Sequence, residues 1–281
     1  MKIITTVKEM QTEADQIRQS GRIIGFVPTM GYLHEGHLSL LRIARKRADM
    51  VVLSIYVNPT QFAPHEDLDR YPRDFKRDEQ LAKQEDVDVI FYPSDKEMYP
   101  PGYHTTVHVE KLTETLCGTS RPFHFQGVTT VCTKLFHAVK PHVAVFGQKD
   151  AQQAIVIRQM VKDLDMDMEI ILAPIIREKD GLAMSSRNIY LSPEERENAL
   201  ALHRSLKIAE DMIHNGERKS GIILKTMRDH LEEKKHIRID YIEIVHPETL
   251  ESLDTIKNHA LIALAVFAGK TRLIDNTIIT I

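Results

Sequence analysis

Residues 26–40 read FVPTMGYLHEGHLSL, and this stretch decides the fold. An apolar run over residues 23–27 stops at Pro28 and predicts a strand, and a helical pattern follows over residues 37–48. Two glycines between them let the backbone approach a ligand closely, and a helix that begins near Gly36 offers free N–H groups to phosphate. Open α/β sheets bind ligands at this position, outside the carboxyl ends of their strands. The stretch therefore predicts a strand-turn-helix unit that binds a nucleotide.

Strand-like and helical segments alternate as far as about residue 176. A nearly continuous, β-branched apolar run over residues 51–57 predicts a strand buried on both faces, and residues 87–91, 143–146 and 169–173 predict further strands. Helical patterns cover residues 73–85, 128–139 and 151–164. This order implies βαβ crossovers, so we predict an α/β fold with a Rossmann-like, doubly wound parallel sheet.

The pattern changes near Ile176. Ser192 as N-cap, Pro193 at the first helical position and two acids after it predict a helix from there to about His214, and a second helix ends near residue 235. Residues 237–244, 261–267 and 273–281 alternate between apolar and polar, as strands with one solvated face do. We predict two domains, a catalytic domain over residues 1–176 and a smaller α+β lid domain over residues 177–281.

Composition narrows the class of protein. The chain has 37 basic and 40 acidic residues, for a net charge of −3, so we expect no nucleic-acid partner. No apolar run reaches the roughly 18 residues that span a bilayer, and the N-terminus lacks the apolar segment of a signal peptide. Cys117 and Cys132 form no C-x-x-C pair and are expected to be reduced. These features predict a soluble, cytoplasmic protein without a membrane partner.

His34 and His37 carry the first chemical signal. Imidazoles three residues apart at a helix start can donate hydrogen bonds to phosphate oxygens. Their spacing differs from that of the zinc-protease motif H-E-x-x-H. A metal site built on the pair, or a helix start with incidental polar residues, remains an alternative.

Two later segments extend this signal. Gly147-Gln148-Lys149-Asp150 follows a predicted strand and opens a helix, so an ammonium and a carboxylate stand at the same topological position as the histidines. Leu182-Ala183-Met184-Ser185-Ser186-Arg187-Asn188 places two hydroxyls and a guanidinium after a turn, which suits a triphosphate. Taken alone, each segment is also compatible with an ordinary polar loop.

The His-x-Gly-His segment resembles the signature of the nucleotidylyltransferase superfamily, and Met184–Arg187 is similar to its mobile second signature. With Asn58-Pro59-Thr60-Gln61-Phe62, Tyr71-Pro72-Arg73 and Gln153 in order, essentially the whole chain resembles the pantoate–β-alanine ligase family. That resemblance implies an AMP-forming ligase of pantothenate biosynthesis. In such an enzyme the pantoate carboxylate attacks the α-phosphorus of Mg-ATP, and the amine of β-alanine then displaces AMP from pantoyl adenylate. It also implies a homodimer with a Rossmann-like domain and a C-terminal lid.

The resemblance also implies site residues. The catalytic positions are His34, His37 (the proposed proton donor) and Lys149 (a transition-state stabiliser). Pantoate maps onto Gln61 and Gln153, and β-alanine maps onto Gln61, although a glutamine at a strand end is often only solvated. Mg²⁺ is expected to be bridged mainly by ATP phosphates, with Asp150 a candidate ligand, and Arg77-Asp78 is not assigned to it. The ATP-binding positions are Met30, Gly31, Tyr32, Leu33, His34, Glu35, Gly36, His37, Gly147, Gln148, Lys149, Asp150, Ile176, Met184, Ser185, Ser186 and Arg187.

Three other functions share part of this pattern. A nucleotidyltransferase that leaves the nucleotide on its product would have the first motif and the fold, and AMP release distinguishes it from a ligase. A histidine-based metallohydrolase would turn over without ATP and would contain metal. A non-catalytic ATP-binding regulator would show no turnover.

Overall fold

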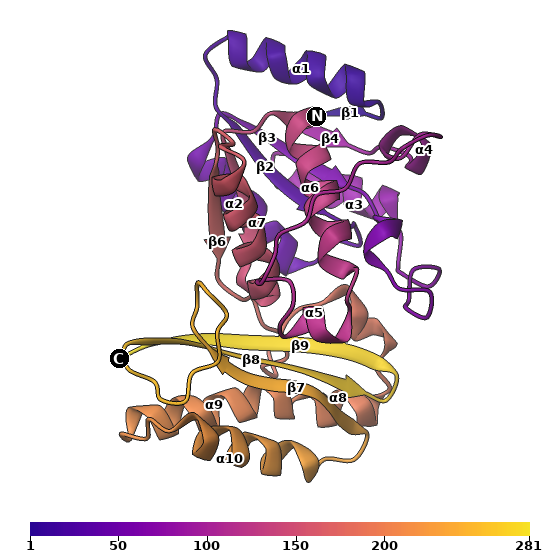
Figure 1. The fold of residues 1–281 in the computed structure, drawn as a ribbon. Coiled ribbons are helices and arrows are strands. Elements are labelled where there is room, and N and C mark those ends of the chain that lie inside the picture. Colours follow the sequence, from indigo (N-terminus) through magenta and orange to yellow (C-terminus); the bar gives the residue numbers. More distant parts are fainter.

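Two β-sheets organise the computed structural model, which describes residues 1–281 (Figure 1). The first sheet has six strands in the order β1-β4-β3-β2-β5-β6, and every pairing in it is parallel. The chain builds outward from β2 through β3 and β4, then returns to lay β5 and β6 on the other side. The order reverses between β2 and β5, which is where such sheets bind ligands. The strands are β1 (Lys2–Ile4), β2 (Ile24–Thr29), β3 (Met50–Ile55), β4 (Val89–Phe91), β5 (Val143–Gly147) and β6 (Glu169–Ala173).

Helices cover both faces of this sheet, because successive strand residues point to opposite sides. Phe26 packs in one core with residues of α1 (Val7–Gln19), α6 (His124–Val139) and α7 (Ala151–Asp163). Val27 packs in another core with α2 (Glu35–Arg47) and α3 (Phe75–Gln84). Short helices α4 (Asp95–Met98) and α5 (Cys117–Ser120) lie in the connection between β4 and α6. The predicted doubly wound parallel sheet is confirmed.

The second sheet is antiparallel, in the order β7-β8-β9. Its strands are β7 (Ile237–Val245), β8 (His259–Ala268) and β9 (Thr271–Thr280), and its helices are α8 (Pro193–Ala199), α9 (Ala201–His214) and α10 (Ser220–Glu232). The helices share a hydrophobic core with one sheet face, and Figure 1 shows α9 and α10 on the side away from the first sheet. The other face turns toward the first sheet, and Leu261 and Ala263 join the core around α6 and α7.

Several helices differ from their predicted bounds by one to three residues, and two differ more. The single helix predicted from Ser192 to His214 is divided at Leu200. The N–H of Leu200 donates to Glu197 O, three residues back, at 3.3 Å. Its φ and ψ, −60° and −19°, stay helical. Helix α6 begins at His124 rather than at residue 128. Its first turn contains Gly127, a weak helix former, because a Cβ there would lie 2.5 Å from Thr60 O.

The predicted domain boundary near residue 176 falls in the connection between β6 and α8. None of the helices combines the length and the apolar character that crossing a membrane requires.

Candidate active site

A cavity of about 1210 Å³ lies at the carboxyl ends of β2 and β5 and reaches the C-terminal sheet. Most residues predicted for the site line it, from both halves of the chain. These are Met30, His34, Gly36, His37, Gln61, Gly147, Lys149, Asp150, Gln153, Ile176, Met184, Ser185, Ser186 and Arg187. Five predicted ATP positions lie beside the cavity without lining it, namely Gly31, Tyr32, Leu33, Glu35 and Gln148.

The turn before α2 is shaped by a buried carboxylate. The backbone N–H groups of Tyr32 and Leu33 each donate to Asp78 of α3, at 2.7 Å. Gly31 has a φ of +81°, and a Cβ on it would lie 2.9 Å from Asp78 Oδ2. Leu33 is fully buried in the core, and Glu35 pairs with an arginine two turns along its own helix. This part of the motif therefore builds the turn, and Asp78 is a supporting residue that sequence reasoning did not assign.

The two histidines cap the helix that they begin. Nδ1 of His34 accepts a hydrogen bond from the Gly36 N–H at 3.1 Å, and Nδ1 of His37 accepts one from the His34 N–H at 3.3 Å. The ring centroids are 4.0 Å apart. Gly36 is needed for this packing, since a Cβ would come within 2.8 Å of His34 Cε1. Because each Nδ1 accepts, the ring proton of each neutral imidazole is on Nε2.

Burial keeps both rings uncharged. Burial, followed by the charge of Lys149, lowers the pKa of His34 to about 4. Burial also lowers the pKa of His37 well below its usual range, and His34 and Lys149 act in the same direction. Each ring therefore offers one neutral N–H donor near neutral pH.

Lys149 and Asp150 lie at a second strand-to-helix opening of the cavity, after β5, as the histidines lie at the first opening, after β2. Gly147 has an ordinary φ of −82°, and a Cβ there would meet nothing within 4 Å, so neither backbone conformation nor packing within the chain requires glycine at this position. The Lys149 ammonium is mostly buried, with Nζ 3.5 Å from Asp150 Oδ2. One positive and one negative group thus line the cavity across from α2.

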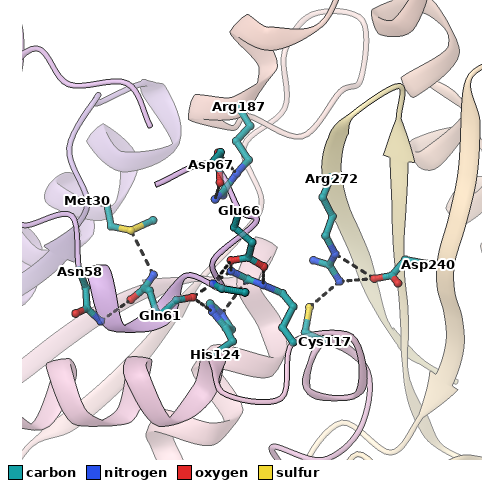
Figure 2. Close-up of polar contacts among 12 residues, drawn as sticks. Met30, Asn58, Gln61, Glu66, Asp67, Cys117, His124, Arg187, Asp240 and Arg272 are labelled. Carbon is teal, nitrogen blue, oxygen red and sulfur yellow. Dashed lines mark hydrogen bonds and ion pairs between the residues drawn. The ribbon is translucent and has the colours of Figure 1, made fainter. Parts of the chain in front are cut away.

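The Met184–Arg187 segment forms another part of the cavity wall. Ser185 caps a short helical turn by accepting from the Arg187 N–H at 3.2 Å, and Ser186 Oγ donates to Tyr32 O at 3.4 Å. The Arg187 guanidinium donates twice to Asp67, with both distances 2.9 Å (Figure 2). No pattern in the sequence points to Asp67, which lies 120 residues before Arg187.

Gln61 is held by its neighbours in the loop after β3. Its Oε1 accepts from Asn58 Nδ2 at 3.1 Å and its Nε2 donates to Met30 Sδ at 3.3 Å (Figure 2). Asn58 is 1% exposed and also donates to Gly127 O at 3.1 Å. Gln153, on α7, lines the same cavity. The two predicted pantoate residues thus share one cavity, and Asn58 orients one of them.

A second polar network holds the wall next to Gln61. Arg121 donates to both carboxylate oxygens of Glu66, at 2.6 and 2.5 Å, and to Gln61 O at 3.2 Å. His124 Nδ1 lies 2.9 Å from Gln61 O. Burial, with the charge of Arg121, lowers the pKa of His124 to about 3. His124 thus forms part of the cavity wall, and no spacing pattern in the sequence links it to Gln61 or Arg121.

A further set of contacts joins α5 to the C-terminal sheet. Cys117 Sγ lies 3.4 Å from Tyr241 Oη and 3.3 Å from Arg272 Nη2. Arg272 donates to Asp240 Oδ2 at 2.7 and 3.0 Å (Figure 2). Both cysteines are buried free thiols. No group of three or more histidine, cysteine or acidic side chains is arranged to hold a metal ion.

Comparison with known proteins identifies close relatives. A family model described as pantoate-beta-alanine ligase matches residues 2–278. A pantothenate synthetase of Thermotoga neapolitana is 58% identical over 279 residues, which cover 99% of this chain and 100% of the relative. The crystal structure of the pantothenate synthetase from Thermus thermophilus has 45% identity and a TM-score of 0.94, with 99% of each chain covered. A pantoate-beta-alanine ligase from Francisella tularensis, complexed with beta-gamma ATP and beta-alanine, has 34% identity and a TM-score of 0.80, covering 99% of this chain and 97% of the other.

Proposed function

The chain belongs to the pantoate–β-alanine ligase family, and from that membership we propose how its cavity joins the two substrates. The enzyme condenses pantoate with β-alanine using ATP, giving pantothenate, AMP and pyrophosphate. We propose that the reaction passes through pantoyl adenylate. The observation that carries this proposal is one cavity in which neutral and cationic donors face a pair of carboxamides.

In the first half-reaction, a carboxylate oxygen of pantoate attacks the α-phosphorus of ATP. A new oxygen–phosphorus bond forms, and the bond to the oxygen bridging the α- and β-phosphorus atoms breaks, so pyrophosphate leaves. In this proposal Lys149 stabilises the charge that grows on the α-phosphate, and the Nε2–H groups of His34 and His37 donate to phosphate oxygens; all three residues line the cavity. The remaining ATP positions given by the resemblance line the cavity or shape its turns.

Pantoate is held by amides rather than by cations. Gln61 and Gln153 hydrogen-bond a hydroxy acid without forming an ion pair with the carboxylate that must attack. A salt bridge there would lower the reactivity of that carboxylate. In the second half-reaction the amine of β-alanine, bound near Gln61, attacks the acyl carbon. The bond from that carbon to the phosphate oxygen breaks, AMP leaves with the electron pair, and the nitrogen loses a proton.

A mixed anhydride with AMP is favoured over an acyl-enzyme. Burial raises the pKa of the Cys132 thiol to about 12, which disfavours a thiolate nucleophile. The Cys117 thiol is buried between Tyr241 and Arg272. Among the cavity serines, Ser185 and Ser186 bond backbone groups, and Ser120 donates to Asp240, a carboxylate that is already paired with Arg272.

The donor set fits Mg²⁺ carried by ATP. Asp150 presents a half-exposed carboxylate at the cavity, and no multi-residue metal cluster accompanies it. One carboxylate with substrate phosphates is the usual environment of this hard cation. When bound, Mg²⁺ neutralises part of the charge on the leaving pyrophosphate.

We also propose that residues 177–281 act as a lid, because an acyl adenylate hydrolyses readily and the site must exclude water. The C-terminal sheet supplies part of the cavity lining, including Asp275 and Asn276. A homodimer in the cytoplasm is proposed from family membership alone. Light scattering of the purified protein tests the dimer.

Isotope exchange between labelled pyrophosphate and ATP tests the proposed intermediate. With Mg²⁺ and pantoate present and β-alanine omitted, exchange is expected, and it should vanish when pantoate is left out. Exchange without any acid would contradict the adenylate, as would ADP and phosphate as products.

A further inference from the structure

The turn that carries Lys149 has no cap of its own. Gly147, at the start of the turn Gln148–Asp150, provides no side-chain hydrogen bond, and neither does Asp150 at the start of α7. By contrast, His34 caps α2 directly. The turn after β5 must therefore be fixed by something outside its own segment.

Asn276 of β9 supplies that support from the C-terminal sheet. Its Nδ2 donates to Gln148 O at 2.8 Å and to Lys149 O at 3.0 Å, and its Oδ1 accepts from Gln148 Nε2 at 3.3 Å. The residue is 3% exposed, and each of these side-chain bonds goes to the turn. A buried carboxamide with its donors and acceptor paired is held in one orientation.

Asp275, the preceding residue on β9, helps to hold Asn276 in place. Asp275 Oδ1 accepts from the Asn276 N–H at 2.8 Å. The same carboxylate binds the guanidinium of Arg177 at 2.6 and 3.0 Å, near the predicted boundary between the two domains. The clamp on the turn thus connects β9 to the segment that links the two halves of the chain.

We propose that Asn276 is a positioning residue for Lys149, through which the C-terminal sheet sets the direction of the ammonium in the cavity. The inference rests on the role of Lys149 in the proposed function. A change in the backbone of the turn is carried along the four-carbon side chain to Nζ, so a small loss of order there displaces the charge from the α-phosphate. Gln148 accordingly belongs to the clamp, and its side chain faces Asn276 rather than ATP.

Two substitutions test this positioning. Asn276→Ala removes the clamp, and Asn276→Asp keeps its shape but places a carboxylate against the two carbonyl oxygens. Each is expected to slow single-turnover pyrophosphate release by about 10–100-fold, the scale of a misplaced catalytic group, with little change in KM for pantoate. Asn276→Asp keeps the test available if the alanine variant folds poorly.

Thr277→Val is the matched control. Thr277 is the next residue on β9, and its hydroxyl donates to Glu210 of α9 at 2.7 Å, so the variant also loses one side-chain hydrogen bond of the same strand. It should keep the wild-type rate of pyrophosphate release. If both folded Asn276 variants also keep that rate, the inference is overturned.

A double-mutant cycle separates positioning from general support. In a Lys149→Ala background, Asn276→Ala should have no further effect on the rate, while its effect on thermal unfolding should be the same in both backgrounds. An equal rate loss with and without Lys149 would show that Asn276 acts through something else, and would overturn the inference. The Lys149→Ala variant alone reports on the proposed function: a wild-type rate there overturns both proposals, whereas a reduced rate with additive effects overturns only this one.

Discussion

The cavity has two strand-to-helix openings, on either side of the point where the sheet order reverses, and they are held in different ways. At the end of β2, His34 and His37 cap their own helix through bonds that span two or three residues. At the end of β5, the turn around Lys149 has no local cap and is held by Asn276, 127 residues later. The helix cap at the first opening is therefore local, whereas the turn at the second opening is held from the C-terminal sheet.

The two openings also differ in the charge of their side chains. The buried histidines are neutral and present fixed N–H donors. Lys149 and Arg187 carry full charges, and each is paired with an acid, Asp150 or Asp67. The position of a neutral donor in a helix cap depends on local packing. The position of a charged group on a long side chain depends on the residues that hold its backbone and on the acid that pairs with it.

The largest expected effect comes from removing one group from each opening. His37→Ala and Lys149→Ala should each slow single-turnover pyrophosphate release by about 10²–10³-fold, the usual loss for a donor that acts on transition-state charge. Their stabilities should differ, since His37 also takes part in the helix cap, which is worth about 0.5–2 kcal/mol. Quenched-flow kinetics and urea unfolding measure the two quantities.

His137 is exposed, and His137→Ala serves as the control. It should change neither the rate of pyrophosphate release nor the free energy of unfolding. A near wild-type rate in either folded active-site variant would remove that residue from the mechanism. Equal stability of the two variants would contradict the contrast between a locally capped and a remotely held opening.

A smaller loss is expected in the acid-binding part of the cavity. Gln61→Ala and Gln153→Ala should weaken pantoate binding by about 1–3 kcal/mol, up to roughly a hundredfold, because a buried polar group of the ligand loses its partner. Asn58→Ala should imitate Gln61→Ala, since Asn58 orients that side chain. Calorimetry with pantoate and, separately, with ATP measures this, and weakened ATP binding with unchanged pantoate binding would place these residues elsewhere.

The next effect has the opposite sign. Asp67→Asn should tighten ATP binding by roughly 1 kcal/mol, about fivefold, because the carboxylate that now pairs with Arg187 would no longer compete with phosphate. The variant should also unfold more easily, since the guanidinium loses a mostly buried partner. Unchanged or weaker ATP binding would mean that Asp67 orients Arg187 for ATP instead of competing for it.

The contrast between the openings also explains what the sequence could predict. The parallel sheet, its helices and the histidine motif follow from local patterns, since apolar runs and turn residues are read within a few positions. The confirmed family resemblance rests on the same short motifs. The break at Leu200 was missed because no helix-breaking residue marks it in the sequence. None is needed there, since the backbone stays nearly helical.

The supporting residues could not be predicted in this way. Asp67, Asp78, His124 and Asn276 act through partners 45 to 128 residues away, and no spacing rule connects them. Asp78 is a single buried acid in an otherwise polar helix, which looks like any solvated position in the sequence. The residues proposed to contact substrate are marked by motifs, whereas the residues that hold them are fixed by tertiary packing.

The last expected effect is the pH dependence of stability at the histidine opening, and it leaves ligand binding aside. An unfolded chain binds protons on histidine below about pH 6.5, but His34 in the folded protein stays neutral until its pKa of about 4. Between these values the unfolded state holds more protons, so the free energy of unfolding falls as the pH falls, by up to about 1.4 kcal/mol per pH unit for each such histidine. Below about pH 4 the folded ring also takes a proton, and its contribution levels off.

The His34→Asn variant tests this prediction. Its side-chain oxygen can accept a hydrogen bond from the Gly36 N–H, but the side chain cannot titrate. The free energy of unfolding should therefore change less steeply between pH 6 and 4.5 in this variant than in the wild type. Urea unfolding at several pH values measures both slopes, and identical slopes would mean that His34 is solvated and charged in the folded protein, which would remove the distinction between a neutral and a cationic opening.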